Sequence, residues 1–399
     1  MVLLSVLLQR LFTPGCCEGP DLVAYAEIAA RQSEQSNFWM RADAFQSNFW
    51  GMLYPTFLHY AQLVTGGSLE AIQWIQRVFV AVLVPGAWLL TAHLGRRVRC
   101  ATVLVLVLSP TTFWLGNSYG YEVLLALFLT FGVVLAWGFG GKEFFQSSGL
   151  NSLVAVASGL LIGLAVLTQS KAIVALPVII FLLWRQKLGR IWWGALGFFI
   201  TVLPWMLRNL VVLGTPSPFS NNAGYNLWVG NNPEAVLGGS LLTAPPLPPG
   251  VTSQLRAGLD FIISQPEAMQ DLFFRKVVRL WQPLYVYPEF IPVGPGRTML
   301  HLVAGLLAAL VVIGFVLFLG GRLFSKPPIV PNVTPIAVLV LLFASSHLPF
   351  IAEPRFMAVI YPLTLSVAVP TLLYLARNLR AAVNGPRPIG SESESSIER

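Results

Sequence analysis

Five ionisable side chains lie beside long apolar stretches of this sequence, where charged groups are costly. They are Asp21, Glu122, Lys171, Arg208 and Arg355. A carboxylate at the edge of a membrane can take part in acid–base catalysis, and a lysine or arginine there can hold an anion such as a lipid phosphate. Because such groups must be paired or solvated to be tolerated beside a bilayer, each is a candidate functional residue.

The two acids also have ordinary structural explanations. Asp21 begins a helical stretch that continues to Arg31, so it either caps this helix or takes part in catalysis. Tyr25 follows one turn later on the same face. Glu122 begins a strongly apolar helix, where an acid in the first turn is favoured by the helix dipole.

The basic residues are more unusual in their positions. Lys171 and Arg355 stand in short turns on the side of the predicted membrane that usually carries little positive charge. Each either snorkels along the apolar surface, pairs with a neighbour such as Glu353, or forms an anion site beside the bilayer. Arg208 stands where a predicted span leaves the membrane and could join that site.

The elements that must position these residues are membrane-spanning helices. Of the 399 residues, 55% are hydrophobic and 11% are charged, against about 25% charged in a typical soluble domain. The mean hydropathy is +0.70. Apolar runs of roughly 17 to 25 residues match the ~30 Å hydrocarbon core of a bilayer. Continuous rather than alternating apolar segments exclude a closed β-barrel.

We therefore expect an all-α polytopic membrane protein with about nine spans. These are residues 72–94, 101–115, 122–139, 150–168, 172–184, 191–207, 299–320, 334–350 and 357–376. The run from Met1 to Phe12 is short and contains Arg10, and we interpret it as the remnant of a first helix whose upstream part is absent.

Basic residues occur in every second connection, which predicts the orientation of the chain. By this rule residues 13–70 and 208–298 face outward as large loops, and 377–399 form a disordered cytoplasmic tail. The predicted parts are a transmembrane catalytic core (1–207), a periplasmic loop (208–298), further spans (299–376) and the tail. The net charge of +8 is used mainly for orientation and predicts no nucleic-acid partner.

Both outward segments carry aromatic and amide residues. Residues 35–39 and 46–50 repeat the pentapeptide Gln-Ser-Asn-Phe-Trp, and this spacing would place Trp39 and Trp50 on one face of an interfacial helix, as anchors or at a substrate site. Residues 219–233 are rich in Asn, Gly and aromatics, which predicts an ordered loop built of turns. Amides and aromatic faces also suit a sugar or a lipid head group.

Other catalytic patterns are missing from the sequence. Cys16, Cys17 and Cys100 form neither a disulfide framework nor a metal-binding spacing, and the four histidines are scattered. The sequence has no P-loop, no Rossmann glycine pattern and no HExxH or GxSxG motif. We expect no metal ion and no cofactor.

Four motifs resemble those of the bacterial GT-C superfamily of polytopic glycosyltransferases, which includes protein mannosyltransferase-like and aminoarabinose-transferase-like enzymes. They are Asp21 with Tyr25 and Ala29-Ala30, Gly159 to Thr168 before a basic turn and Pro177, Pro204-Trp-Met-Leu-Arg-Asn209 with Gly214 and Gly230-Asn-Asn-Pro233, and Arg355-Phe356 before Tyr361-Pro362.

The resemblance implies a GT-C-like bundle of about 9–10 helices with large outward loops. It also implies a transferase in the bacterial inner membrane, with its active site facing the periplasm, that moves a sugar from a polyprenyl-phosphate donor to an acceptor hydroxyl on a glycan, lipid or protein. Asp21 would act as the base and Glu122 would assist. Lys171, Arg208 and Arg355 are expected to bind the donor phosphate. Expected substrate contacts are Tyr25, Tyr54, Asn209, Asn226, Asn231 and Asn232.

Two alternatives remain at this point. A transporter or lipid flippase would place charges near the bilayer midplane and often repeats its halves, whereas the unusual charges here stand at span ends. An inactive relative of the superfamily is the other alternative. Leu22 follows Asp21 where relatives often have a second acid, and Gln169 and Ser170 separate Lys171 from Thr168.

Overall fold

The structure is a computed structural model that describes residues 20–45, 48–138, 147–237, 244–282, 297–324, 330 and 332–383. Within these ranges every regular element is a helix, which confirms the expected all-α class. The short run at 1–12, with Cys16 and Cys17, lies outside the described residues, as do Gln46, Ser47 and the last sixteen residues.

Each of the nine predicted spans overlaps a helix. These are α4 (Leu69–Leu90), α5 (Arg96–Leu108), α7 (Glu122–Trp137), α8 (Ser148–Thr168), α9 (Leu176–Gln186), α10 (Gly189–Leu213), α15 (Arg297–Phe324), α16 (Thr334–Ser345) and α18 (Tyr361–Val383). By length and composition, α4, α8, α10 and α15 can each cross a membrane. A fifth crossing is formed if α5 and α6 (Pro110–Asn117), bent by 55°, count as one. The polytopic class is therefore confirmed.

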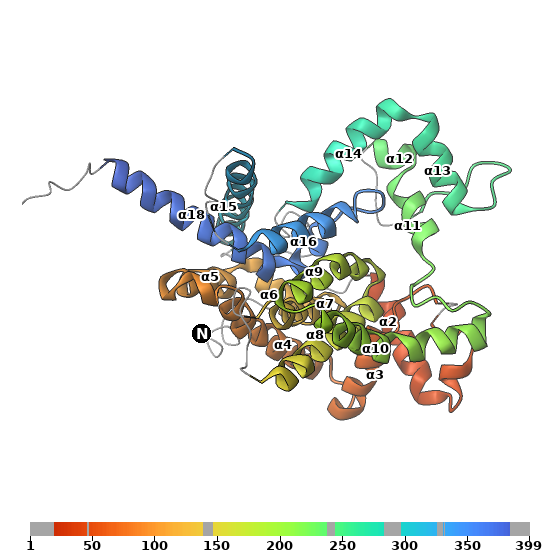
Figure 1. Cartoon of the computed structure of the whole chain (residues 1–399). Helices are drawn as coiled ribbons and strands as arrows, with labels where there is room; N and C mark the ends of the chain where they lie inside the picture. The colour runs from red at the N-terminus through yellow and green to blue at the C-terminus, as the bar shows by residue number, and fades with distance from the viewer. Residues whose placement is uncertain are drawn as a thin grey trace, which may run out of the picture.

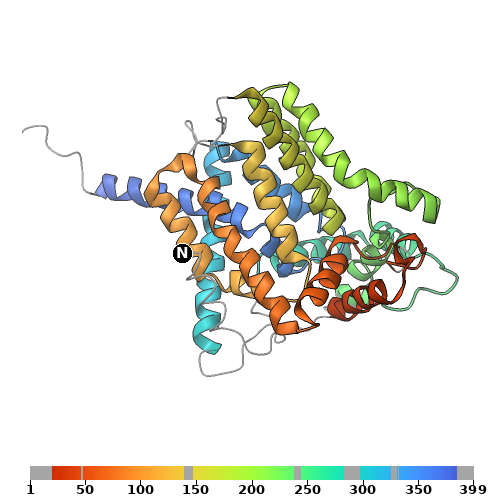
Figure 2. The ribbon, with the colours of Figure 1, turned by 90° about the horizontal axis from the view of Figure 1, so that it is seen from below.

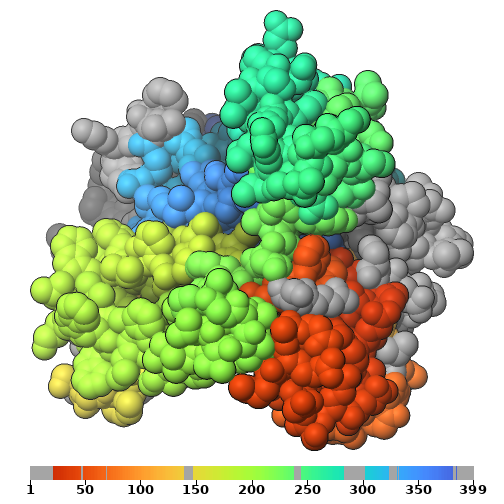
Figure 3. Space-filling model, turned by 90° about the vertical axis from the view of Figure 1, so that its right-hand side faces the viewer, coloured from red at the N-terminus to blue at the C-terminus, as the bar shows by residue number. Residues whose placement is uncertain are grey.

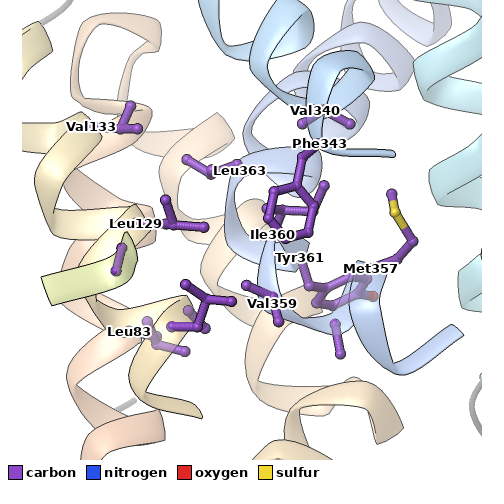
Figure 4. Packing of buried hydrophobic residues seen from close by; sticks show 14 of the residues in the cluster. Leu83, Leu129, Val133, Val340, Phe343, Met357, Val359, Ile360, Tyr361 and Leu363 are labelled. Carbon is purple, nitrogen blue, oxygen red and sulfur yellow. The ribbon is translucent and has the colours of Figure 1, made fainter. Parts of the chain in front are cut away.

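Most of the helices pack around one large apolar core, and two smaller clusters lie apart from it. Leu83 of α4 and Leu129 of α7 face Phe343 of α16 and Leu363 of α18 in the large core, and all four are at most 1% exposed (Figure 4). The short helix α17 (Pro354–Val359) is buried at the same place. The core thus joins helices from both halves of the chain.

Helices α8 and α10 lie side by side at the edge of the bundle (Figure 2). They approach so closely that a Cβ on Gly159 would collide with the carbonyl of Gly194, and one on Gly197 with that of Val156. Small residues allow such close backbone packing between membrane helices. The glycines of the Gly159–Thr168 motif therefore hold the end of α8 in place.

The two segments predicted to face outward, here called the first and second outward segments, gather at one end of the bundle, which we call the loop end (Figure 1). The first contains α2 (Pro20–Glu34), the short helix η1 (Phe38–Met40) and α3 (Leu53–Thr65), and the second contains α11 (Ala223–Gly230), α12 (Pro233–Val236), α13 (Gln254–Ser264) and α14 (Pro266–Leu280). Helix α18 ends at the opposite side, which we call the tail end.

Two expectations need correction. The loop of turns predicted at 219–233 is wrong for α11, where Asn222 precedes a helix and apolar Leu227 and Val229 are buried. The disordered tail predicted from residue 377 is wrong up to Val383, because α18 continues that far. The basic residues at its end suit the negative end of the helix dipole, so they do not stop the helix.

Candidate active site at the loop end

A pocket of about 310 Å³ lies at the loop end, between segments that are far apart in the sequence. It combines charged, aromatic and amide side chains. Its lining residues are Asp21, Tyr25, Phe49, Trp50, Gly51, Tyr121, Thr168, Gln169, Lys171, Ser220, Asn222, Tyr225, Asn226, Ile351, Glu353, Arg355 and Phe356.

The guanidinium of Arg355 is the centre of an ion cluster in this pocket. Its Nη1 donates to Oδ2 of Asp21 at 2.8 Å and lies 3.7 Å from Oε1 of Glu122. Its Nε lies 2.7 Å from Oε2 of Glu353. The side chains of Asp21 and Arg355 keep 22% and 21% of their surface exposed, whereas that of Glu122 keeps 1%. One cation therefore holds three acids, of which Asp21 is the most accessible.

Local sequence explains how each charge reaches this point. Asp21 stands in the first turn of α2, and Glu122 is the first residue of α7. A Cβ on Gly120 would collide with the carboxylate of Glu122, so a larger residue there would displace this carboxylate from its present position. Pro354 begins α17 and holds Arg355 in its first turn.

Lys171 provides the second positive charge of the pocket. It belongs to η3 (Ser170–Ala175), the turn between α8 and α9. Its Nζ lies 5.0 Å from the ring centre of Phe350 and 5.3 Å from that of Phe356, within the range of cation–π contacts. Burial, with the nearby charge of Lys276, lowers the pKa of Lys171 to about 7. An anion in the pocket would favour its charged form.

Aromatic rings form one wall of the pocket. Tyr25 meets the rings of Trp50 and Tyr54 edge to face, at centroid distances of 5.1 and 5.0 Å. Burial and the charge of Asp21 raise the pKa of Tyr25 well above its usual range, so its hydroxyl stays protonated. Gly51 lies so close to the carbonyl of Thr168 that no side chain would fit there.

The first outward segment also contacts the segment that follows α10, and the two lie against each other in Figure 3. The side chain of Asn48 donates to the carbonyl of Phe219 at 2.6 Å, and the amide of Asn221 donates to the carbonyl of Asn48 at 2.9 Å. Ser170 and Ser220 join the turn after α8 to the same segment at 3.1 Å. These bonds hold three walls of the pocket together.

The structure brings five of the predicted site residues into this pocket, and they are Asp21, Tyr25, Lys171, Asn226 and Arg355. Two others lie just behind it. Glu122 is 1% exposed and meets the pocket only through Arg355. Tyr54 is fully buried behind Tyr25, and its hydroxyl donates to Gln76 at 3.2 Å. Neither residue is part of the pocket lining.

Arg208 and Asn209 lie outside the pocket lining. Nε of Arg208 donates to the carbonyl of Trp39 at 2.8 Å, and Nη2 donates to that of Arg41 at 2.5 Å. Asn209 is buried and donates to the carbonyl of Ser217 at 2.7 Å. The Pro-Trp-x-x-Arg-Asn motif thus fastens the first outward segment to α10.

Asn231 and Asn232 are likewise buried outside the pocket lining. The side chain of Asn231 donates to the carbonyl of Pro349 at 2.8 Å and accepts from Nζ of Lys276 at 2.8 Å. Asn232 caps α12 through the amide of Ala235 at 2.9 Å. A Cβ on Gly230 would collide with the backbone of Phe350. The Gly-Asn-Asn-Pro motif therefore supports the loop that leads to Arg355.

The two pentapeptide copies have different surroundings, and the single helix expected for them is wrong. Trp39 lies in η1, where its ring is 6.4 Å from that of Trp205. Trp50 lies in an irregular stretch and lines the pocket. Asn48 has a φ of 65°, a left-handed backbone that ends any continuous helix between the copies.

Several pocket residues were not singled out from the sequence. Glu353 appeared only as a possible partner of Arg355, and Gln169, Asn222 and Tyr225 were not named as site residues. Gln169 donates to the hydroxyl of Tyr121 at 3.0 Å. The one local signal was position, because Gln169 and Glu353 stand in the same short turns as Lys171 and Arg355.

Within the described ranges, no group of three or more His, Cys, Asp and Glu side chains is arranged to hold a metal ion. The three acids of the pocket surround a guanidinium instead. The positive charges in the pocket lining come from Arg355 and Lys171.

Comparison with solved structures finds the same fold in an archaeal oligosaccharyltransferase. Over 98% of its length the chain superposes, at 14% identity and a TM-score of 0.54, on the oligosaccharyltransferase of Archaeoglobus fulgidus tethered to an acceptor peptide. The match covers 51% of that protein, so the chain spans about half of its length. ArnT of Cupriavidus metallidurans matches over 94% of this chain and 76% of its own, at 14% identity and a TM-score of 0.45.

The fold expected from the resemblance to GT-C enzymes is thereby confirmed. No protein-family model matches the chain, and no curated protein matches it.

Proposed function

We propose that this protein transfers a sugar from a polyprenyl-phosphate donor to an acceptor hydroxyl at the loop end, on the outer face of a bacterial inner membrane. The observation that carries the proposal is the meeting of Asp21 with Arg355 and Lys171 in one pocket with aromatic and amide walls. A base and two cations side by side are what transfer from a phosphate-linked sugar needs. The shared fold with an oligosaccharyltransferase is consistent with it.

The reaction requires one bond to form and one to break. The acceptor oxygen attacks C1 of the sugar, its proton passes to the carboxylate of Asp21, and the bond from C1 to the phosphate oxygen breaks with its electron pair on the phosphate. General-base help of this kind is typically worth about 10²–10⁴-fold in rate. Direct displacement inverts the configuration at C1.

The cations act on the leaving group. Charge builds on the departing phosphate as the bond breaks, and fixed positive groups stabilise it. Arg355 suits this role because a guanidinium can bind phosphate through two parallel hydrogen bonds. Lys171 adds a compact charge in the turn next to the predicted bilayer surface, within reach of a lipid-borne phosphate.

Arg355 also couples the two substrates. In the structure its Nη1 donates to Oδ2 of Asp21, so this carboxylate oxygen is already engaged in a hydrogen bond. A donor phosphate competes for the same guanidinium, so donor binding frees Asp21 to accept the proton of the acceptor. Glu122 and Glu353 hold Arg355 from the other sides and act as positioning residues.

The pocket walls support a carbohydrate substrate. Tyr25, Trp50 and Tyr225 offer aromatic faces to the apolar side of a sugar ring, while the amides of Asn222 and Asn226 can pair with hydroxyl groups. The acceptor is a glycan, a lipid or a protein with a free hydroxyl.

The test is sugar transfer by the purified protein. A panel of polyprenyl-phosphate sugars is supplied, and release of the lipid phosphate is followed. Asp21→Asn should lower kcat about 10²–10⁴-fold. Asp43→Asn is the matched control, because Asp43 is an exposed acid of the same segment that pairs with Arg41, and it should keep full activity. Full turnover by Asp21→Asn contradicts the assigned base.

The same assay separates a transferase from a transporter. A transporter or flippase would move the lipid-linked sugar between the leaflets of a vesicle and leave the bond from sugar to phosphate intact. Lipid phosphate released in step with glycosylated acceptor supports the transferase, and movement without bond cleavage contradicts it.

A further inference from the structure

A second cavity, of about 550 Å³, lies between α9 and α16 on the side of the bundle. These helices contact each other near the middle of the bundle (Figure 1). The walls of this cavity are apolar and include Phe181, Val338 and Leu342, which are 40%, 42% and 37% exposed. The cavity is thus a groove on the surface that faces lipid in a spanning bundle. It shares no lining residue with the loop-end pocket.

The groove has a defined direction. Along α9 the groove is lined by Pro177, Phe181 and Arg185, and along α16 by Thr334, Val338 and Leu342. Within each set the residues are four positions apart, which places them on one face of their helix. Helix α9 starts after Lys171, while α16 is followed by Phe350, which contacts Lys171. The two helices are therefore antiparallel, with Arg185 and Thr334 toward the tail end.

The length of the groove suits half of a bilayer. Eight residues of α9 separate its two ends, which corresponds to about 12 Å at 1.5 Å per residue. The hydrocarbon core is ~30 Å thick, so one leaflet contributes about 15 Å. The groove can therefore hold one acyl chain of a lipid in the leaflet at the tail end.

Two arginines stand at the tail end of the groove, one from each side. Arg185 stands in the last turn of α9 and Arg322 in the last turn of α15. The guanidinium of Arg185 lies 6.0 Å from the ring centre of Phe181, which holds it along the groove wall. Neither arginine has an ion-pair partner in the described part of the chain. Asn332 and Thr334 add an amide and a hydroxyl beside them.

We propose that this groove binds a phospholipid with an anionic head group from the leaflet at the tail end, its phosphate between Arg185 and Arg322 and one acyl chain along α9 and α16. Basic pockets between helices on the cytoplasmic side commonly hold such head groups. The occupant differs from the donor lipid, whose phosphate belongs beside Lys171 at the other end. The proposal holds whether or not the protein is a transferase.

The experiment measures lipid retention by the full-length protein. Purified protein in detergent is titrated with dioleoylphosphatidylglycerol or dioleoylphosphatidylcholine, and bound lipid is counted by native mass spectrometry. Wild type should retain the anionic lipid preferentially. Arg185→Gln with Arg322→Gln should weaken its binding about 30-fold, since each arginine near an anionic group contributes about fivefold. Equal retention of both lipids by wild type overturns the proposal.

Matched variants separate this site from general surface charge. Arg96→Gln with Arg97→Gln removes two exposed arginines from the start of α5 and should leave retention unchanged. Val338→Trp fills the groove, keeps both arginines, and should also lower retention while the elution profile of the protein stays that of wild type. Loss of retention in the control pair, or full retention in Val338→Trp, contradicts the groove.

A competition arm tests the source of the lipid. A short-chain polyprenyl phosphate should leave the phosphatidylglycerol in place, because its phosphate is expected beside Lys171. Displacement of the phosphatidylglycerol from wild type would assign the groove to a polyprenyl phosphate and overturn the proposal.

Discussion

Two sets of polar residues at the loop end look alike in the sequence but have different partners in the structure. Asp21, Lys171 and Arg355 meet other charged or aromatic side chains around a pocket and remain partly accessible. Arg208 and Asn231 donate mainly to backbone carbonyls. A polar group bonded to backbone fastens segments together, whereas one that faces another charge across a pocket can exchange its partner for a substrate.

The largest expected effect on activity is that of a substitution at Arg355, the centre of the ion cluster in the pocket. Arg355→Lys keeps the charge but removes the planar fork that holds Asp21 and Glu353 and would bind phosphate. We expect kcat to fall about 10²–10³-fold, the range seen when one transition-state donor is lost. Sugar transfer at saturating donor measures it. A decrease in kcat of less than about threefold would mean that Arg355, like Arg208 and Asn231, only holds segments of the chain together.

A pair of asparagines in and next to α11 sharpens the comparison. Asn231→Ala removes the acceptor of the buried Lys276 ammonium, so we expect a loss of about 1–3 kcal/mol in the free energy of unfolding, read as a lower Tm. Asn226→Ala, at the pocket, should keep the Tm and raise KM. If the two variants exchanged these effects, the division into pocket and fastening residues would be wrong.

The pH dependence tests Lys171. Because its pKa is lowered to about 7, its protonated fraction falls about tenfold between pH 6 and 8, and donor KM should rise about as much. Lys171→Arg should remove this dependence, since arginine stays charged. Stability runs the other way. Above pH 7 the unfolded chain binds the proton more tightly, so this lysine makes the free energy of unfolding rise with pH up to about 10.5.

The smallest effect is expected at Arg208. Arg208→Lys can keep only part of the bonds to the carbonyls of Trp39 and Arg41, which should cost about 1 kcal/mol of stability. Donor KM should stay within twofold of wild type at a temperature where both are folded. A large rise in donor KM would instead return Arg208 to the phosphate site that its position in the sequence suggested.

Much of the fold follows from the sequence because the bilayer imposes a simple rule. Every backbone group in hydrocarbon must be bonded within its own helix, so apolar runs of sufficient length become helices. All nine expected spans overlap helices for this reason. The candidate charged residues were also predicted from the sequence. A lysine in a short turn on the predicted outward side, such as Lys171, departs from the rule that basic residues lie on the cytoplasmic side.

The residues that these charged side chains contact could not be predicted from the sequence. Asp21 and Arg355 are 334 positions apart in the sequence, and no local signal indicates that the two meet. The identical pentapeptides make the same point, because Trp50 lines the pocket while Trp39 packs against Trp205. The same five-residue sequence therefore occurs in two different environments. The segments that pack against each copy determine which environment it has.

The sequence by itself determined the class of this protein, its helices and the short set of charged residues that had to be explained. Hydropathy and the placement of charges are local properties, and they govern directly how each segment interacts with a membrane. Only the tertiary structure decided which charges form a pocket and which fasten the chain. That choice depends on the packing of α2, α7 and α17 around Arg355, and on the carbonyls that happen to face Arg208 and Asn231. Such contacts are made between distant segments, and no single segment encodes them.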